Sequence, residues 1–183
     1  MTKIFIGGSR NVTRLNDLVT ARLDNIINNS FRVLIGDANG ADKAVQKYLA
    51  DKGHRNVMVF CMNDKCRNNI GNWETRVVTA EQGKRGFEFY ALKDSQMAEE
   101  ATHGFMLWDG KSNGTLNNVV NLLTRDKKVV VFYWPTQRFY TLFDANDVTD
   151  LLGNCSSADL AGFDKKLGLS ERLNLALPEF QLA

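Results

Sequence analysis

The first ten residues, MTKIFIGGSR (1–10), set out a pattern that the rest of the chain repeats. An apolar run, Ile4–Ile6, is followed at once by two glycines, a hydroxyl and a guanidinium. Similar runs end in glycine and small polar residues at 32–42, RVLIGDANGAD, and at 104–115, GFMLWDGKSNGT. Continuous apolar runs are typical of strands in a parallel sheet that is covered on both faces. The three stretches therefore predict buried strands, each with a polar, glycine-rich end.

Segments with a helical period of apolar residues separate these strands. The period of 3.6 predicts helices over 16–28, 41–51 and 115–125, and Asn16 is expected to cap the first. Further strands are expected over 56–61 and 128–134, with an edge strand at 138–143 and a short helix at 145–153. The alternation predicts an α/β fold, with a Rossmann-like open parallel sheet and helices on both faces.

Two segments stand apart from this rhythm. Residues 63–86 are polar and rich in asparagine, and long irregular stretches inside a compact domain are often functional. We expect them to form a lid, with a helical part over 73–82, followed by a short helix near 95–103. We expect one α/β domain over 1–153 and a helical appendage over 154–183.

The composition narrows the possible partners. The chain has 183 residues, 44% of them hydrophobic, and a net charge of +2, which gives no broad basic surface for nucleic acid. No apolar run is long enough to span a bilayer, and a strand begins by Lys3, before any signal peptide could form. We therefore expect a cytoplasmic protein with no membrane partner, and assembly into a homo-oligomer is left open. Cys61, Cys66 and Cys155 are odd in number and lack paired spacing, so we expect reduced thiols, no metal site and no cofactor.

The glycine-rich strand ends have the parts of an anion-binding site. In an open α/β sheet, ligands bind beyond the carboxyl ends of the strands, where helix N-termini attract negative charge. Glycine lets the backbone approach a phosphate, and the planar fork of Arg10 suits two phosphate oxygens. Turn formation alone explains any one of these loops, whereas three at one sheet edge favour a binding site.

Three aspartates lie near these loops and have competing explanations. Asp42 falls in the first turn of a helix, where the helix dipole favours a carboxylate whether or not a ligand binds. Asp94 is suited to capping a helix or to chemistry, and Asp109 ends a strand at a turn. Trp108 is expected to pack in the core rather than to stack on a base.

Four motifs in order, IFIGGSR, GDANGAD, KDSQMAEEAT and LWDGKSNGTLNN, resemble the SLOG superfamily. This superfamily includes the DNA-processing protein DprA and the Lonely-guy phosphoribohydrolases, and the chain is more distantly similar to nucleoside 2-deoxyribosyltransferases. The resemblance spans about Met1 to Tyr133 and implies a Rossmann-like fold with a small nucleotide-type ligand. It implies ligand contacts from the residues at the motif positions, namely Gly7, Gly8, Ser9, Arg10, Gly36, Gly40, Asp42, Asp109, Gly110, Ser112, Gly114, Thr115 and Asn118.

The sequence departs from this pattern at Asn118, which stands where the hydrolases carry a glutamate. An amide orients a ribose hydroxyl but supplies no negative charge to an oxocarbenium-like transition state. Three functions therefore remain open. They are nucleotide binding without catalysis, cleavage or transfer at an N-glycosidic bond, and single-stranded DNA binding. For the second, the carboxylate would come from Asp94, from Asp109, or from Glu74 or Glu88.

Overall fold

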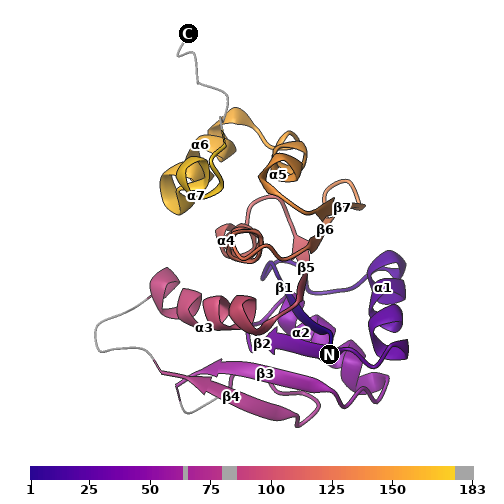
Figure 1. The fold of residues 1–183 in the computed structure, drawn as a ribbon. Coiled ribbons are helices and arrows are strands. Elements are labelled where there is room, and N and C mark those ends of the chain that lie inside the picture. The colour runs from indigo at the N-terminus through magenta and orange to yellow at the C-terminus, as the bar shows by residue number, and fades with distance from the viewer. Residues whose placement is uncertain (64–65, 80–85, 176–183) are drawn as a thin grey trace.

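The computed structural model describes residues 1–63, 66–79 and 86–175. Within these ranges, one seven-stranded sheet lies between two layers of helices (Figure 1). The strands are β1 (Lys3–Gly8), β2 (Arg32–Gly36), β3 (Val57–Met62), β4 (Glu74–Val78), β5 (His103–Trp108), β6 (Val129–Tyr133) and β7 (Arg138–Leu142). The helices are α1 (Asp17–Asn28), α2 (Ala41–Asp51), α3 (Gly86–Glu100), α4 (Asn113–Leu123), α5 (Ala145–Leu152), α6 (Ser157–Leu167) and α7 (Leu169–Leu173).

The strand order, β4-β3-β2-β1-β5-β6-β7, confirms the predicted open α/β sheet. Neighbouring strands pair in parallel from β4 to β6, and only β7 runs antiparallel. The chain moves outward from β1 to β4 and then returns to place β5 on the other side of β1. Such a reversal opens a crevice beyond the carboxyl ends of the two central strands, where ligands bind in open α/β sheets. The fold thus places a candidate site between the ends of β1 and β5.

Two apolar clusters hold the layers together, one on each face of the sheet. Leu23 of α1 and Leu49 of α2 pack with Ile35 on one face, and all three are fully buried. On the other face, Met97 of α3 and Leu116 of α4 belong to a second cluster, which also contains Phe5 of β1. Figure 1 shows α1 and α2 on one side of the sheet and α3 and α4 on the other. Both faces are covered, as the continuous apolar strands predicted.

The C-terminal helices extend the second cluster. Phe163 of α6 lies 5.8 Å from the ring of Trp108, measured between ring centroids, and Leu169 of α7 is fully buried. Trp108 is 1% exposed, so the prediction that it packs in the core is confirmed. The described part of the 154–183 segment therefore shares its core with α4 and β5; residues 176–183 lie outside the described ranges.

Several local predictions are confirmed. Asn16 caps α1, because its side chain accepts a hydrogen bond of 3.0 Å from the backbone N–H of Val19. The expected edge strand is β7, joined to β6 by the four-residue loop 134–137, and such a short loop allows only antiparallel pairing. The short helix expected at 145–153 is α5.

Two predictions around the long polar segment are wrong. Residues 74–78 form the strand β4 rather than part of a helix, because Thr75, Val77 and Val78 suit a strand and pair with β3. The short helix expected near 95–103 begins earlier, and α3 runs without a break over Gly86–Glu100. Phe89, Tyr90 and Leu92 pack against the apolar cluster on this face of the sheet, and this packing extends the helix through residues 86–94. Asp94 consequently lies inside a helix and does not cap one.

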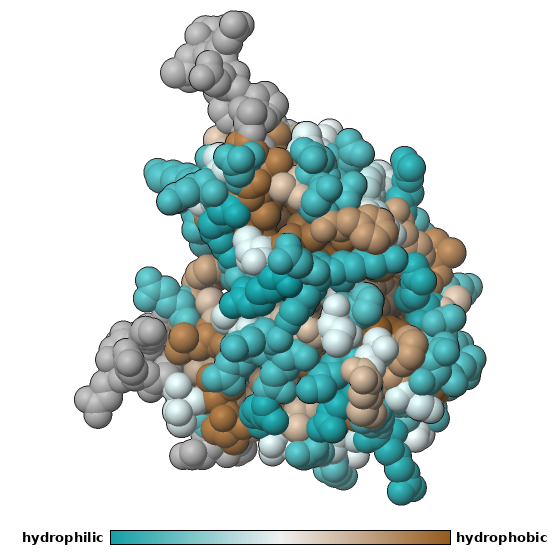
Figure 2. Space-filling model, in the orientation of Figure 1, coloured by the Kyte–Doolittle hydropathy of each residue, from teal (hydrophilic) through white to brown (hydrophobic). Residues whose placement is uncertain are grey.

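The surface gives little sign of a large apolar interface on the face shown. Figure 2 shows mostly hydrophilic residues there, with hydrophobic ones reaching the surface in separate groups. Among the described residues, no helix combines the length and apolar character needed to cross a membrane.

Candidate functional site

A cavity of about 310 Å³ lies where the crevice was expected, beyond the ends of β1 and β5. Its volume is at the lower end of the range of ligand pockets, roughly 300–1,000 Å³. The wall is built from the loops after β1 and β5, from one side of α3 and from the first turns of α4. The residues that line it are Phe5, Gly7, Gly8, Ser9, Arg10, Asn11, Ala38, Asp42, Arg67, Tyr90, Lys93, Asp94, Met97, Asp109, Lys111, Ser112, Gly114, Thr115 and Asn118.

Asp109 joins the two central loops. Its Oδ2 accepts hydrogen bonds from Ser9 Oγ at 2.6 Å and Asn11 Nδ2 at 2.8 Å, and its Oδ1 accepts from the backbone N–H groups of Lys111 and Ser112. Burial acts to raise the pKa of Asp109, but the bonds from Ser9, Asn11 and the two backbone groups outweigh it and hold that pKa below its usual value. Both oxygens are therefore already occupied by protein donors.

The mouth of the cavity is positively charged. Arg10 is exposed, and its guanidinium lies 5.6 Å from the centre of the Tyr90 ring; it has no ion-pair partner among the described residues. Lys111 stands nearby and pairs with Asp159 at 2.7 Å on the surface. The first turn of α4 opens onto the same mouth, with Ser112 as its cap. Cations and a helix N-terminus together favour an anionic group here.

The inner wall is instead rich in hydrogen-bond acceptors. Asn118 is 6% exposed, and its Oδ1 is the buried side-chain atom without a hydrogen-bond partner in the described part of the chain. Asp94 lies beside it and is only partly exposed. Burial raises the pKa of Asp94, although the charge of Lys93 and a hydrogen bond from Asn118 oppose this rise. A buried acceptor without a donor is costly, so this wall suits a ligand that donates hydrogen bonds.

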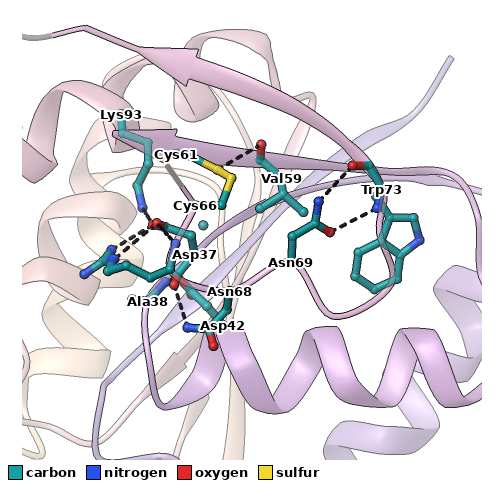
Figure 3. The surroundings of a disulfide bond; sticks show 12 residues. Asp37, Ala38, Asp42, Val59, Cys61, Cys66, Asn68, Asn69, Trp73 and Lys93 are labelled. Atoms are coloured by element: carbon teal, nitrogen blue, oxygen red, sulfur yellow. Dashed lines mark hydrogen bonds and ion pairs between the residues drawn. A yellow bond between two sulfur atoms is a disulfide. The ribbon is translucent and has the colours of Figure 1, made fainter. Parts of the chain in front are cut away.

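Beside the acceptor wall lies an ionic cluster around the buried carboxylate of Asp37, and its two cations, Lys93 and Arg67, line the cavity. Lys93 Nζ and Arg67 Nη2 each lie 2.7 Å from Asp37 Oδ1, and Figure 3 shows Lys93 reaching down to this carboxylate. Burial acts to raise the pKa of Asp37, but the bonds from Arg67 and the charge of Lys93 outweigh it and hold the pKa far below its usual value. Nearby Asp42 shows the opposite balance. Burial raises the pKa of Asp42 to about 7, and the charge of Lys93 only partly opposes this rise.

Several glycines shape the cavity without lining it. A Cβ on Gly36 would lie 2.5 Å from Asp42 Oδ2 and 3.0 Å from Lys93 Nζ, so glycine leaves room for both charged groups. Gly40 has a φ of +84°, and a side chain there would run into the backbone of Arg10. Gly110 has a φ of +77° and faces Tyr133. These three residues, expected as ligand contacts, lie behind the wall.

The structure brings together the remaining expected site residues and adds others. Glu74 and Glu88 do not line the cavity. The additions that matter most come from α3 and the loop after β3: Tyr90, Lys93 and Arg67. Lys93 could have been predicted from the sequence, since it directly precedes Asp94 in the motif KDSQMAEEAT. Arg67 could not be placed at the cleft, because its position depends on how residues 66–79 fold.

The same loop corrects the prediction of reduced thiols. Cys61 and Cys66 form a disulfide, with their Cα atoms 5.0 Å apart (Figure 3). Cys155 is a free thiol. The spacing of five residues gave no indication of this pairing, which follows from the way the chain returns beside β3. Residues 64–65 and 80–85 of the expected lid lie outside the described residues.

The cavity offers no obvious place for a metal ion. No group of three or more His, Cys, Asp or Glu side chains in the described ranges is arranged to hold one. The sequence matches no protein-family model, and a search of curated proteins finds no match. The fold and the cleft together define a Rossmann-like α/β protein with a polar cleft at the switch point of its sheet.

Proposed function

We propose that this protein binds a nucleotide or a nucleotide-derived small molecule in the cleft between β1 and β5. The observation that carries the proposal is the division of the cleft into two chemistries. The mouth, with Arg10, Lys111 and the start of α4, suits a phosphate, and the inner wall, with Asp94 and Asn118, suits hydroxyl donors. A sugar phosphate carries both a phosphate and hydroxyl groups. The resemblance of the glycine-rich motifs to the SLOG superfamily supports the same class of ligand.

The experiment is a thermal-shift panel of nucleoside monophosphates and ADP-ribose. A ligand at about one hundred times its dissociation constant adds roughly 2.7 kcal/mol of stability, which a melting curve detects easily. Inorganic phosphate and the free nucleosides serve as controls, because each offers only one of the two chemistries. No shift across the whole panel would remove the basis of the proposal.

A second candidate is cleavage or transfer at the N-glycosidic bond of such a ligand. It is favoured by Asp94, whose carboxylate belongs to the acceptor wall beside Asn118. Asp109, in contrast, already accepts four hydrogen bonds from protein donors. Such chemistry needs a carboxylate near the sugar carbon where positive charge develops. We therefore assign the chemical role to Asp94 and the positioning role to Asp109.

Release of free base, followed by chromatography, tests this second function. We expect any base release to be lost in Asp94→Asn and retained in Glu99→Gln, which removes an exposed carboxylate from the same helix. Base release that survives in Asp94→Asn would contradict the assignment. A protein that binds nucleotides and releases no base would be a binding protein only.

A further inference from the structure

The Cys61–Cys66 disulfide lies directly beside a residue of the cleft wall. Cys61 is buried near the end of β3, Cys66 is partly exposed, and the next residue, Arg67, lines the cavity. We infer that this disulfide is a redox control on the cleft, and that its reduction loosens Arg67 and weakens the binding of an anionic ligand. The effect on ligand binding rests on the proposed function, whereas the loosening of Arg67 on reduction does not.

Arg67 is held in place by a single carboxylate. Its backbone N–H and its Nε donate to Asp37 Oδ2 at 3.0 and 3.1 Å, and its Nη2 donates to Asp37 Oδ1 at 2.7 Å. Its guanidinium lies 4.7 Å from the centre of the Tyr90 ring, and Tyr90 also faces Arg10 across the mouth. The position of residue 67 therefore sets one wall of the cleft and its local charge.

Polar contacts fix the residues that follow to the loop after β2 and to α2. Asn68 Nδ2 donates to the carbonyl of Asp37 at 2.8 Å, and the backbone N–H of Ile70 donates to Gln46 Oε1 at 3.0 Å. Hydrogen bonds of this kind each contribute little net stability, while fixing a residue costs conformational entropy. A covalent bond from residue 66 to β3 removes much of that freedom in advance.

Loss of the disulfide changes the charge of the cleft as well as its shape. When Arg67 leaves Asp37, Lys93 is the one remaining cation that the described structure pairs with this buried carboxylate. The cleft wall then loses a positive charge that lies over the same Tyr90 ring as Arg10 of the mouth. An anion is bound less tightly as a result.

The redox step is an ordinary thiol–disulfide exchange with a dithiol reductant. A thiolate of the reductant attacks the sulfur of Cys66, the more accessible partner, and the Cys61 sulfur leaves as a thiolate and takes up a proton. The second thiol of the reductant then attacks the mixed disulfide and releases Cys66. Two electrons and two protons pass to the protein, and the reductant becomes a disulfide.

The experiment compares oxidised and dithiothreitol-reduced protein in a Cys155→Ser background, which removes the free thiol. AMP and ADP-ribose are titrated calorimetrically against both forms, and hydrogen exchange is measured for residues 66–70 without ligand. We expect about tenfold weaker binding after reduction, which corresponds to the loss of one charge-assisted hydrogen bond. We also expect faster hydrogen exchange of residues 66–70. Cys66→Ser should bind like the reduced form and should not respond to dithiothreitol.

The outcomes separate this inference from the proposed function. Equal affinity before and after reduction overturns the redox control and leaves nucleotide binding intact. Binding in neither state overturns the nucleotide proposal, and hydrogen exchange then decides the structural part. Unchanged exchange on reduction, or two free thiols at Cys61 and Cys66 in protein purified without reductant, overturns the inference in every case.

Discussion

Ser9 Oγ and Asp109 Oδ2 lie 2.6 Å apart, although the two residues are one hundred positions apart in the chain. The bond joins the loop after β1 to the loop after β5, at the switch point where the chain begins to add strands on the other side of β1. Both loops form the cleft, so this contact sets the distance between its two sides.

The first prediction concerns this contact. We expect Asp109→Asn to lower the free energy of unfolding by about 1–3 kcal/mol, because an amide cannot accept hydrogen bonds from both Ser9 and Asn11 while serving the backbone of α4. Urea unfolding measures the change. Asp159→Asn, which breaks the exposed pair with Lys111, is the control and should change stability by well under about 1 kcal/mol. Full stability of Asp109→Asn with loss of base release would mean that Asp109 acts chemically.

The second prediction is that Arg10→Ala removes nucleotide binding without unfolding the protein. Arg10 is exposed at the cleft mouth, so its loss removes charge-assisted bonds to a phosphate and no core packing. Calorimetric titration and a melting curve measure the two effects. Arg14→Ala is a matched control, since Arg14 is an exposed arginine of the same loop and does not line the cavity. Equal loss of binding in both variants would point to general electrostatics rather than to a site.

The third prediction follows from the raised pKa of Asp42. Burial raises the pKa of Asp42 to about 7 in the folded protein, whereas in the unfolded chain Asp42 has the ordinary pKa of 3.8. Between pH 3.8 and about 7 the folded state holds a proton that the unfolded state has lost, so the stability of the wild type falls as the pH rises through this window and levels off above it. We expect Asp42→Asn to gain stability relative to the wild type as the pH rises from 5 to 8. Melting curves across that range measure this, and a constant difference would show that Asp42 does not titrate there.

The fourth prediction concerns the buried ionic cluster. We expect Lys93→Met to lower stability by about 3 kcal/mol, because Lys93 is 3% exposed in its side chain and Asp37 would be left buried with one cation fewer. Lys47→Met breaks an exposed pair with Asp51 and is the matched control, with an expected change below about 0.5 kcal/mol. Chemical unfolding measures both, and equal effects would contradict a structural role for the cluster.

Much of the fold was open to prediction from the sequence. The apolar runs and the helical periods are local properties, and they located β1, β2, β3, β5 and β6 together with α1, α2 and α4. The same reasoning failed at residues 74–78. Thr75, Val77 and Val78 favour a strand, but they form one here because β3 offers a free edge to pair with, and that edge exists only in the folded sheet.

The sequence by itself determined which loops would meet, since parallel strands bring their carboxyl ends to one edge of the sheet. Gly7 to Arg10 and Asp109 to Thr115 were predicted to share a site for that reason, and they do line one cavity, apart from Gly110 and Asn113. Only the tertiary structure decided what lies opposite them. Lys93, Arg67 and Tyr90 come from segments whose placement depends on packing across the sheet, and so does the pairing of Cys61 with Cys66. The opposite pKa shifts of Asp37 and Asp42 are likewise a property of the assembled layers. Burial acts to raise the pKa of both aspartates, and folding brings the hydrogen bonds of Arg67 and the charge of Lys93 to Asp37, whereas at Asp42 burial outweighs the charge of Lys93.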